Sequence, residues 1–305
     1  MAKKRQALYG LIGFPVKHSF SCAMHNAAFN HCRIDAEYRL FEIPPAELEN
    51  FLLDNKDLAG FNITIPHKVR ARQILEKNFP PSGNKNLIEA SAYYVKLSGA
   101  VNTVKRALSG LEYFNTDAVG FLKSLEEDLK FTIKGKTAML FGCGGAGRAV
   151  IAALSWKNLG VKKIYLYDSE EESLLSFKEH LYSLPSEWKN IFQEKIEFIE
   201  KEKIAEKIEE SQLLVNATPL GMKEGDLPPV DKNLLHKGLF VYDLVYNRNT
   251  ELIKAARLVC GENKVSGGLG MLLYQGAAAW ELWMGKLAPV EVMRQALNQE
   301  LKKKC

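Results

Sequence analysis

TAMLFGCGGAG, residues 137–147, is the stretch of this chain that says most about its fold. An apolar run typical of a buried strand is followed by glycines at 142, 144 and 147, and then by RAVIAALSWKNL, which is typical of a helix. Glycines at this spacing allow a tight turn, a close approach of the backbone to a pyrophosphate, and close packing of the helix on the strand. The N-terminus of such a helix also presents free N–H groups to phosphate. We therefore expect a dinucleotide-binding loop, contacted through Gly142, Gly144, Gly145, Ala146 and Gly147.

An acidic residue, Asp168, ends the next apolar run, KKIYLY, 21 residues beyond Gly147. At this place in a dinucleotide-binding fold, a carboxylate accepts hydrogen bonds from the adenosine ribose and repels a 2′-phosphate. Residues 169–172 are SEEE and include no arginine that could bind such a phosphate. We therefore expect NAD as the cofactor and regard NADP as less favoured. Asp168 could equally cap the following helix, and the two roles are compatible.

Strand-like and helix-like runs alternate on both sides of this stretch. Residues 6–65 follow a β-α-β-α-β rhythm, residues 99–115 contain two further strand-like runs, and a second alternation occupies residues 137–246. Such alternation predicts the α/β class, with parallel sheets covered by helices. The second alternation is typical of a six-stranded dinucleotide-binding domain.

Composition and charge exclude several classes of protein. The chain has 305 residues, of which 47% are hydrophobic and 25% charged, and its 41 basic and 36 acidic residues leave a scattered net charge of +5. Neither a nucleic-acid partner nor a membrane partner is expected, because no basic patch and no run of about 20 apolar residues occurs. The five cysteines lack metal-binding spacing, so no metal site is expected. We expect a cytoplasmic protein.

Eight motifs, which occur in one order along nearly the whole chain, are similar to those of the shikimate dehydrogenases, including the quinate/shikimate dehydrogenase branch. They are GFPVKHSFSCAMHN (13–26), GFNITIPHK (60–68), GAVNT (99–103), NTDAVGF (115–121), GCGGAG (142–147), NATPLGM (216–222), DLVYN (243–247) and GGLGMLLYQGAAAWELW (267–283).

The resemblance implies two lobes with catalysis in the cleft between them. A substrate-binding α/β domain would comprise residues 1–115 plus 271–305, and a Rossmann-type NAD(P)-binding domain residues 116–270. The resemblance also implies that the protein is an NAD(P)-dependent oxidoreductase acting on a CH–OH group. Such an enzyme would reversibly reduce 3-dehydroshikimate to shikimate. Its partner would be this small molecule, and the protein would be a monomer or a homodimer.

Two alternatives stay open. One is a quinate/shikimate dehydrogenase that acts mainly on quinate with NAD, and the other is a non-catalytic regulator that senses shikimate or quinate. Retention of Ser19 and Ser21 favours shikimate, whereas Asp168 stands where NADP-using members commonly carry arginine and so favours the NAD-using branch.

The resemblance also assigns residues to roles. Lys68 and Asp117 match the catalytic pair, and Ser19 and Ser21 match the serines that hold the substrate carboxylate. The remaining substrate-binding candidates are Asn62, Thr64, Asn102, Tyr246 and Gln275, and the remaining cofactor-binding candidates are Thr218, Gly268 and Met271.

Reduction of a ketone requires an acid that protonates the forming alkoxide. Lys68 follows Pro66, which suits a first helical turn, so its ammonium lies near the positive end of a helix dipole. That position disfavours the ammonium, whereas contact with Asp117 favours it. Lys68 therefore either transfers the proton itself or positions the substrate and stabilises the alkoxide.

Overall fold

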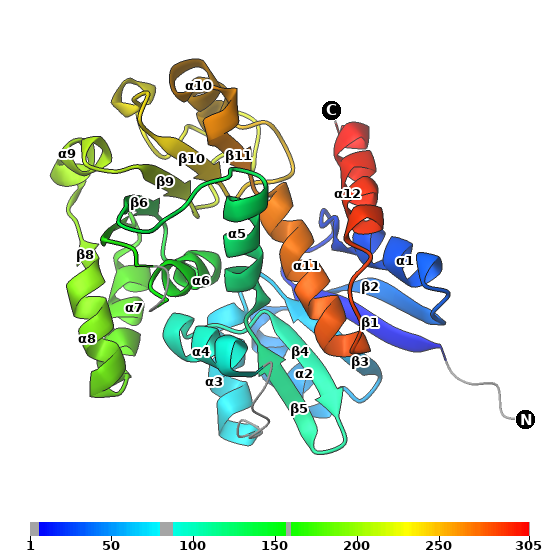
Figure 1. Ribbon diagram of the computed structural model, residues 1–305. Helices are drawn as coiled ribbons and strands as arrows, with labels where there is room; N and C mark the ends of the chain where they lie inside the picture. The colour runs from blue at the N-terminus through cyan, green and yellow to red at the C-terminus, as the bar shows by residue number, and fades with distance from the viewer. Residues whose placement is uncertain (1–5, 80–87, 157–159, 305) are drawn as a thin grey trace, which may run out of the picture. The chain divides into compact units, whose positions relative to one another are not determined.

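The computed structural model describes residues 6–79, 88–156 and 160–304, with side chains for all of these except residues 88–92, 187, 191 and 304. The elements form two compact units (Figure 1). Unit 1 comprises residues 1–120 and 273–303, and unit 2 comprises residues 121–272. Both units are of the α/β class, as expected.

Unit 1 contains a five-stranded sheet of order β2-β1-β3-β4-β5. Strand β1 pairs in parallel with β2 and β3, whereas β4 is antiparallel to both β3 and β5. The strands are β1 (Ala7–Gly13), β2 (Ala36–Glu42), β3 (Leu58–Ile63), β4 (Thr103–Ala107) and β5 (Gly110–Phe114).

Helices cover both faces of this sheet. Alternate residues of a strand point to opposite faces. Accordingly, Ile12 packs in a cluster with residues of α2, α3 and α4, whereas Tyr9 lies 5.2 Å from Phe29 of α1 and 5.0 Å from Trp283 of α11, measured between ring centroids. The helices are α1 (Ser21–His31), α2 (Leu48–Asp54), α3 (Lys68–Asn78), α4 (Ile88–Ser98), α11 (Leu269–Met284) and α12 (Val290–Lys304). Residues 269–272 of α11 belong to unit 2.

Unit 2 contains a six-stranded sheet of order β11-β10-β9-β6-β7-β8, in which every pairing is parallel. When the six strands are numbered 1 to 6 in sequence and the sheet is read from β8, this is the order 3-2-1-4-5-6 of dinucleotide-binding sheets. The topological switch point of such a sheet lies here between β6 and β9. The strands are β6 (Thr137–Phe141), β7 (Lys163–Tyr167), β8 (Ile196–Phe198), β9 (Leu213–Asn216), β10 (Phe240–Asp243) and β11 (Val265–Gly267).

The two faces of this sheet are also covered. Met139 and Val241 pack with Ile208 of α9 and Ile253 of α10 on one face, whereas the next residue of β10, Tyr242, meets Phe121 of α5. The helices are α5 (Thr116–Glu127), α6 (Gly145–Leu154), α7 (Glu171–Ser183), α8 (Ser186–Lys195), α9 (Ile204–Glu209) and α10 (Glu251–Cys260). Residues 116–120 of α5 belong to unit 1. Short 3₁₀ turns lie at Pro45–Glu47, Lys201–Lys203, Lys232–Leu234 and Glu262–Lys264.

Within the described ranges, no helix is both long and apolar enough to span a membrane. No group of three or more His, Cys, Asp or Glu side chains among the same residues is arranged to hold a metal ion. Cys22, Cys32, Cys143 and Cys260 are free thiols, and Cys305 lies outside the described residues.

Candidate active site

One edge of the unit 1 sheet gathers the polar residues of the expected catalytic centre. Asn62 of β3 is paired with Thr103 of β4, and Thr103 is paired with Phe114 of β5. Because β4 is antiparallel to its neighbours, its amino end lies beside the carboxyl ends of β3 and β5. Lys68 follows β3, Asn102 precedes β4 and Asp117 follows β5, so the three residues come together at this edge.

Lys68 and Asp117 form an ion pair. The Lys68 Nζ donates to Asp117 Oδ2 over 2.6 Å, and the side chains are only 11% and 7% exposed. Lys68 is the first residue of α3, and Asp117 lies in the first turn of α5, where the helix dipole stabilises a carboxylate. Removing one partner of such a buried pair leaves an uncompensated charge, which typically costs about 3–5 kcal/mol.

Asn102 holds the second oxygen of the Asp117 carboxylate. The Asn102 Nδ2 donates to Asp117 Oδ1 over 2.9 Å and also lies 3.3 Å from the Oε1 of Gln275. Gln275 belongs to α11 and is 173 residues away in the chain, so only the fold brings it here. All three side chains are buried.

Ser19, Ser21 and Thr64 lie at the same edge. Ser19 and Ser21 follow β1, and the Ser19 hydroxyl lies 3.2 Å from the Ser21 hydroxyl and accepts the Ser21 backbone N–H over 3.3 Å. Thr64 directly follows β3 and packs against the end of β1, since a Cβ at Gly13 would lie 2.4 Å from its Cγ2. The two serines thus form a local pair of hydroxyls.

The glycine-rich loop joins β6 to α6 in unit 2. Gly142 has a φ of +93°, and a Cβ at Gly147 would lie 2.1 Å from the Gly142 carbonyl oxygen, so both positions require glycine. A Cβ at Gly144, in contrast, meets no atom within 4 Å. Open space therefore lies beside Gly144 at the N-terminus of α6, where the N–H groups of a helix favour an anion. Gly145 and Ala146 form the first turn of that helix.

Thr218 lies beside this loop, across the switch point. It follows β9, and its Cγ2 would lie 3.0 Å from a Cβ at Gly142. Its hydroxyl donates to Asn216 Oδ1 over 2.7 Å. Unit 2 therefore brings Thr218 together with the glycine-rich loop at the switch point, the place where ligands bind in open α/β sheets.

The other expected residues of unit 2 follow β10 and β11. A Cβ at Gly268 would lie 2.0 Å from the Leu244 carbonyl oxygen, so this glycine allows two backbone segments to touch. Met271 is buried and donates its backbone N–H to the Tyr242 hydroxyl over 3.1 Å. Tyr246 is half-buried in the loop after β10.

Two groups of polar residues were missed by the sequence analysis. In unit 2, Asp243 is fully buried, accepts from Asn216 Nδ2 and the Thr250 hydroxyl over 2.9 and 2.6 Å, and has a pKa raised by burial. Asn216 and Asp243 each end an apolar strand, which is the pattern that could have revealed them. In unit 1, buried Tyr38, Thr103 and Thr116 surround Asn62 and Asn102. Thr103 and Thr116 belong to the motifs GAVNT and NTDAVGF, which could have revealed them, whereas Tyr38 lies in no such motif.

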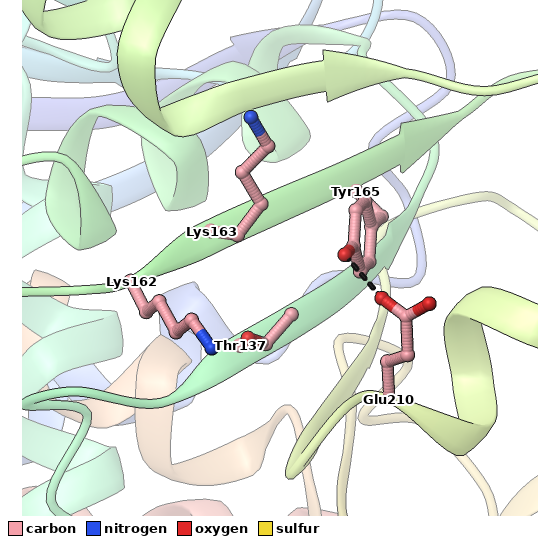
Figure 2. Close-up of a pocket in the computed structure, with 5 residues that line it drawn as sticks. All are labelled: Thr137, Lys162, Lys163, Tyr165 and Glu210. Atoms are coloured by element: carbon pink, nitrogen blue, oxygen red, sulfur yellow. Dashed lines mark hydrogen bonds between the residues drawn. The ribbon is translucent and has the colours of Figure 1, made fainter.

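A pocket of about 450 Å³ lies elsewhere in unit 2 (Figure 2). It is lined by Thr137, Lys162, Lys163, Tyr165 and Glu210. Thr137 is the first residue of β6, whereas the glycine-rich loop follows its last residue, so the pocket lies at the opposite end of that strand. Figure 2 shows Tyr165 directed at Glu210, while the two lysines project in different directions. The pocket is therefore separate from the expected dinucleotide site.

Comparison with known proteins gives consistent matches. Models of the "Shikimate dehydrogenase substrate binding domain" and the "Shikimate 5'-dehydrogenase C-terminal domain" match residues 11–83 and 268–297. A Methanopyrus kandleri protein named "Shikimate dehydrogenase (NADP(+))" is 38% identical over 298 residues, which cover 96% of this chain and 95% of the relative.

Solved structures match over the same extent. A shikimate dehydrogenase crystallised with NADP+ has a TM-score of 0.78 and 32% identity, covering 97% of this chain and 96% of its own. A quinate dehydrogenase from Corynebacterium glutamicum in complex with NAD has a TM-score of 0.78 and 28% identity, covering 96% of this chain and 99% of its own.

The expectation that NAD is preferred is wrong: the Methanopyrus kandleri relative is named for NADP(+), and the first of these solved structures holds NADP+. The structure supplies a reason why Asp168 misled. Its Oδ2 accepts the Cys143 N–H over 2.7 Å and its Oδ1 accepts the Glu170 N–H over 3.0 Å. The carboxylate thus fastens the glycine-rich loop to the end of β7, a task within the protein that does not depend on the cofactor.

The similarity extends well beyond one motif or one unit. A relative more than 30% identical covers nearly the whole chain, and matching family models cover both its N-terminal part and α11. The chain therefore belongs to the shikimate dehydrogenase family and is an oxidoreductase that acts on a CH–OH group.

Proposed function

We propose that this protein catalyses the reversible, NADP-dependent reduction of 3-dehydroshikimate to shikimate. The observation that carries the proposal is the buried Lys68–Asp117 ion pair of 2.6 Å, at the sheet edge that also holds Asn102 and Gln275. The names of the relatives supply the substrate and the cofactor.

Residues of unit 1 would bind the substrate. The paired hydroxyls of Ser19 and Ser21 suit a carboxylate, since both can turn their protons towards it. Thr64, Asn102 and Gln275 offer hydroxyl and amide groups to the ring hydroxyls. Tyr246, from the loop after β10 in unit 2, is a further candidate contact.

Residues of unit 2 would bind the dinucleotide. The N–H groups at the start of α6 and the open space at Gly144 suit the pyrophosphate, while Thr218, Gly268 and Met271 are candidate contacts further along the cofactor. When bound, the nicotinamide ring supplies or accepts the hydride. We propose the domains accordingly, with the substrate residues other than Tyr246 in unit 1 and the cofactor residues in unit 2.

Lys68 would act on the substrate oxygen that becomes the C3 hydroxyl. Its ammonium donates a hydrogen bond to the carbonyl, and its positive charge stabilises the alkoxide that forms when hydride reaches the carbon. A proton from Nζ then completes the hydroxyl, and exchange with water restores the ammonium. Asp117 orients Nζ through its Oδ2. Asn102 donates to Oδ1 and so holds the carboxylate in contact with Lys68.

Substitution of Lys68 tests the proposal. Lys68→Ala is expected to lower kcat at least about a hundredfold, the scale of lost acid–base catalysis, while the Kd for shikimate changes less than about threefold. Steady-state rates and calorimetric binding measure the two effects. Lys56→Ala, an exposed lysine of the same unit, is the matched control and is expected to leave both unchanged. Equal turnover in Lys68→Ala and the unsubstituted protein contradicts the proposal.

Similarity to a quinate dehydrogenase makes quinate the second candidate substrate. Values of kcat/KM for shikimate and quinate with NADP decide between them. We expect the higher value with shikimate, because both Ser19 and Ser21 are present. A higher value with quinate reverses the assignment, and binding without turnover of either compound indicates a sensor.

A further inference from the structure

A chain of buried polar side chains leads away from the catalytic pair into the core of unit 1. Tyr38 of β2, Asn62 of β3 and Thr103 of β4 are 0%, 4% and 0% exposed. The Tyr38 hydroxyl lies 2.8 Å from Asn62 Oδ1, and Asn62 Nδ2 lies 2.9 Å from Thr103 Oγ1. Thr103 Oγ1 in turn lies 3.1 Å from Asn102 Oδ1.

Backbone groups fix the direction of these hydrogen bonds. Asn62 Nδ2 also faces the carbonyl oxygen of Asn102 over 3.3 Å, so this side of the Asn62 amide must donate. The opposite side, Oδ1, accepts from Tyr38. The Asn102 Oδ1 accepts the backbone N–H of Thr116 over 2.7 Å, so its Nδ2 must face Asp117.

Thr103 connects the two amides. Its Oγ1 accepts a hydrogen bond from Asn62 Nδ2. Its own O–H therefore donates to Asn102 Oδ1 or to the Thr116 hydroxyl, 2.9 Å away. Every link therefore points the same way: Tyr38 to Asn62, Asn62 to Thr103, Thr103 to the Asn102–Thr116 pair, and Asn102 to Asp117. Hydrogen bonds in such a series polarise and strengthen one another.

We propose that Tyr38, Asn62 and Thr103 are positioning residues that act through Asn102 on the Lys68–Asp117 pair. This inference rests on the proposed function, because the three residues are proposed to support the proton transfer from Lys68. The series of hydrogen bonds keeps the Asn102 amide N–H directed at Asp117. The Asp117 carboxylate is thereby kept in the position from which it orients Lys68 Nζ. Both polar atoms of the Asn62 side chain already have hydrogen-bond partners, namely Tyr38, Thr103 and the Asn102 carbonyl. We therefore infer that Asn62 acts on the site through Thr103.

Stability alone does not account for this arrangement. Buried hydroxyl and amide groups contribute little net stability relative to apolar groups of the same shape, yet each becomes costly when its partner is removed. A fully partnered series across β2, β3 and β4 therefore constrains one geometry more than it strengthens the fold. That geometry ends at the Asp117 carboxylate.

Two substitutions test the inference. Thr103→Val preserves the shape of the side chain and removes the hydroxyl, and is expected to lower kcat about tenfold with KM for shikimate changed less than about threefold. Thr103→Ser retains the hydroxyl and is expected to restore kcat to within about twofold. Steady-state kinetics with shikimate and NADP gives both values, and thermal unfolding confirms that each variant is folded.

Tyr38→Phe removes the first donor of the chain and is the second test if Thr103→Val does not fold. It is expected to lower kcat about threefold. Tyr113→Phe is the matched control: Tyr113 lies on β5 of the same sheet, and its buried hydroxyl has no hydrogen-bond partner among the described residues. It is expected to leave kcat unchanged.

A double-substitution cycle shows whether the effect passes through Asp117. In an Asp117→Asn background, Thr103→Val is expected to lower kcat no further. If Thr103→Val and Tyr38→Phe change only the unfolding temperature, or if the effects of Thr103→Val and Asp117→Asn multiply, the inference is overturned. Loss of turnover in Lys68→Ala would still support the proposed function in that case, whereas retained turnover there would refute the function itself.

Discussion

Among single residues, His25 of α1 is a titratable group enclosed by aromatic rings. Its ring is fully buried, stacks on Tyr38 at 4.4 Å between centroids, and lies 5.4 Å from the ring of Trp283. Neither ring nitrogen has a hydrogen-bond partner within the described part of the chain. Burial lowers the pKa of His25 to about 3, so the folded protein holds this imidazole neutral.

The pH dependence of stability follows from that burial. Between about pH 6.5 and pH 3 the unfolded chain binds a proton at His25 that the folded chain does not, so stability falls as pH falls. From pH 7.5 to pH 5 this one group lowers the free energy of unfolding by about 2 kcal/mol, at about 1.4 kcal/mol per pH unit below 6.5. His25→Leu is expected to reduce the loss by that amount.

Urea unfolding at the two pH values measures the difference. His31→Leu, at the exposed end of the same helix, controls for the loss of a histidine. If His25→Leu loses as much stability as the unsubstituted protein between pH 7.5 and pH 5, His25 is protonated in the fold and its predicted burial as a neutral ring is incorrect.

Among the elements, the loop from β6 to α6 contains two glycines with different reasons for being glycine. At Gly147 an added methyl group would lie 2.1 Å from the Gly142 carbonyl oxygen, whereas at Gly144 it would meet open space. The backbone at Gly144 has φ −63° and ψ −178°, which alanine also adopts. Packing requires a glycine at position 147, whereas the proposed ligand requires one at position 144.

Alanine at the two positions is therefore expected to have different effects. Gly147→Ala should lower the free energy of unfolding by about 1–3 kcal/mol, the usual cost of overpacking. Gly144→Ala should unfold like the unsubstituted protein but raise KM for NADP about tenfold, since its methyl group occupies the space assigned to the pyrophosphate. Urea unfolding and steady-state kinetics separate the two, and an unchanged KM in Gly144→Ala refutes that assignment.

The longer elements could be predicted from the sequence, because their periodicity extends over several turns or strand residues. The expected strand at TAMLF is β6, and the apolar run of residues 270–283 lies in α11, where Trp280 and Trp283 are buried. Strand β11 was not expected: Val265–Gly267 is too short for a pattern, and pairing with β10 decides it. The helix expected at RAVIAALSWKNL, residues 148–159, begins at Gly145 and ends at Leu154; residues 157–159 lie outside the described ranges.

At the scale of the whole molecule, the proposed substrate residues of unit 1 and the glycine-rich loop of unit 2 belong to bodies with separate sheets and separate cores. Each ligand is therefore expected to protect its own unit. Saturating ligand at about 100 times Kd stabilises the state that binds it by about 2.7 kcal/mol. Shikimate alone should slow amide exchange around α1 and the start of α3, and NADP alone around the start of α6.

Hydrogen exchange followed by mass spectrometry reads both regions in one experiment. Gly144→Ala serves as the control, because it should weaken the protection by NADP and leave that by shikimate unchanged. Protection by shikimate alone that is confined to the loop of residues 142–147 contradicts the division of ligands between the units.

The sequence by itself determined the α/β class, the glycine-rich loop and the family, because those depend on patterns of neighbouring residues that persist over many positions. It could also select Lys68 and Asp117, although only through the resemblance, since a lysine after a proline has no distinctive chemistry of its own. Tertiary structure alone decided that Asn102 contacts both Asp117 and Gln275, and that Tyr38 and Thr103 are linked to Asn102 through hydrogen bonds. Tertiary structure also decided the role of Asp168, because its carboxylate accepts a hydrogen bond from the Cys143 N–H, 25 residues away. Hydrogen bonds between distant segments depend on the pairing register of strands and the packing of helices, which no local pattern encodes.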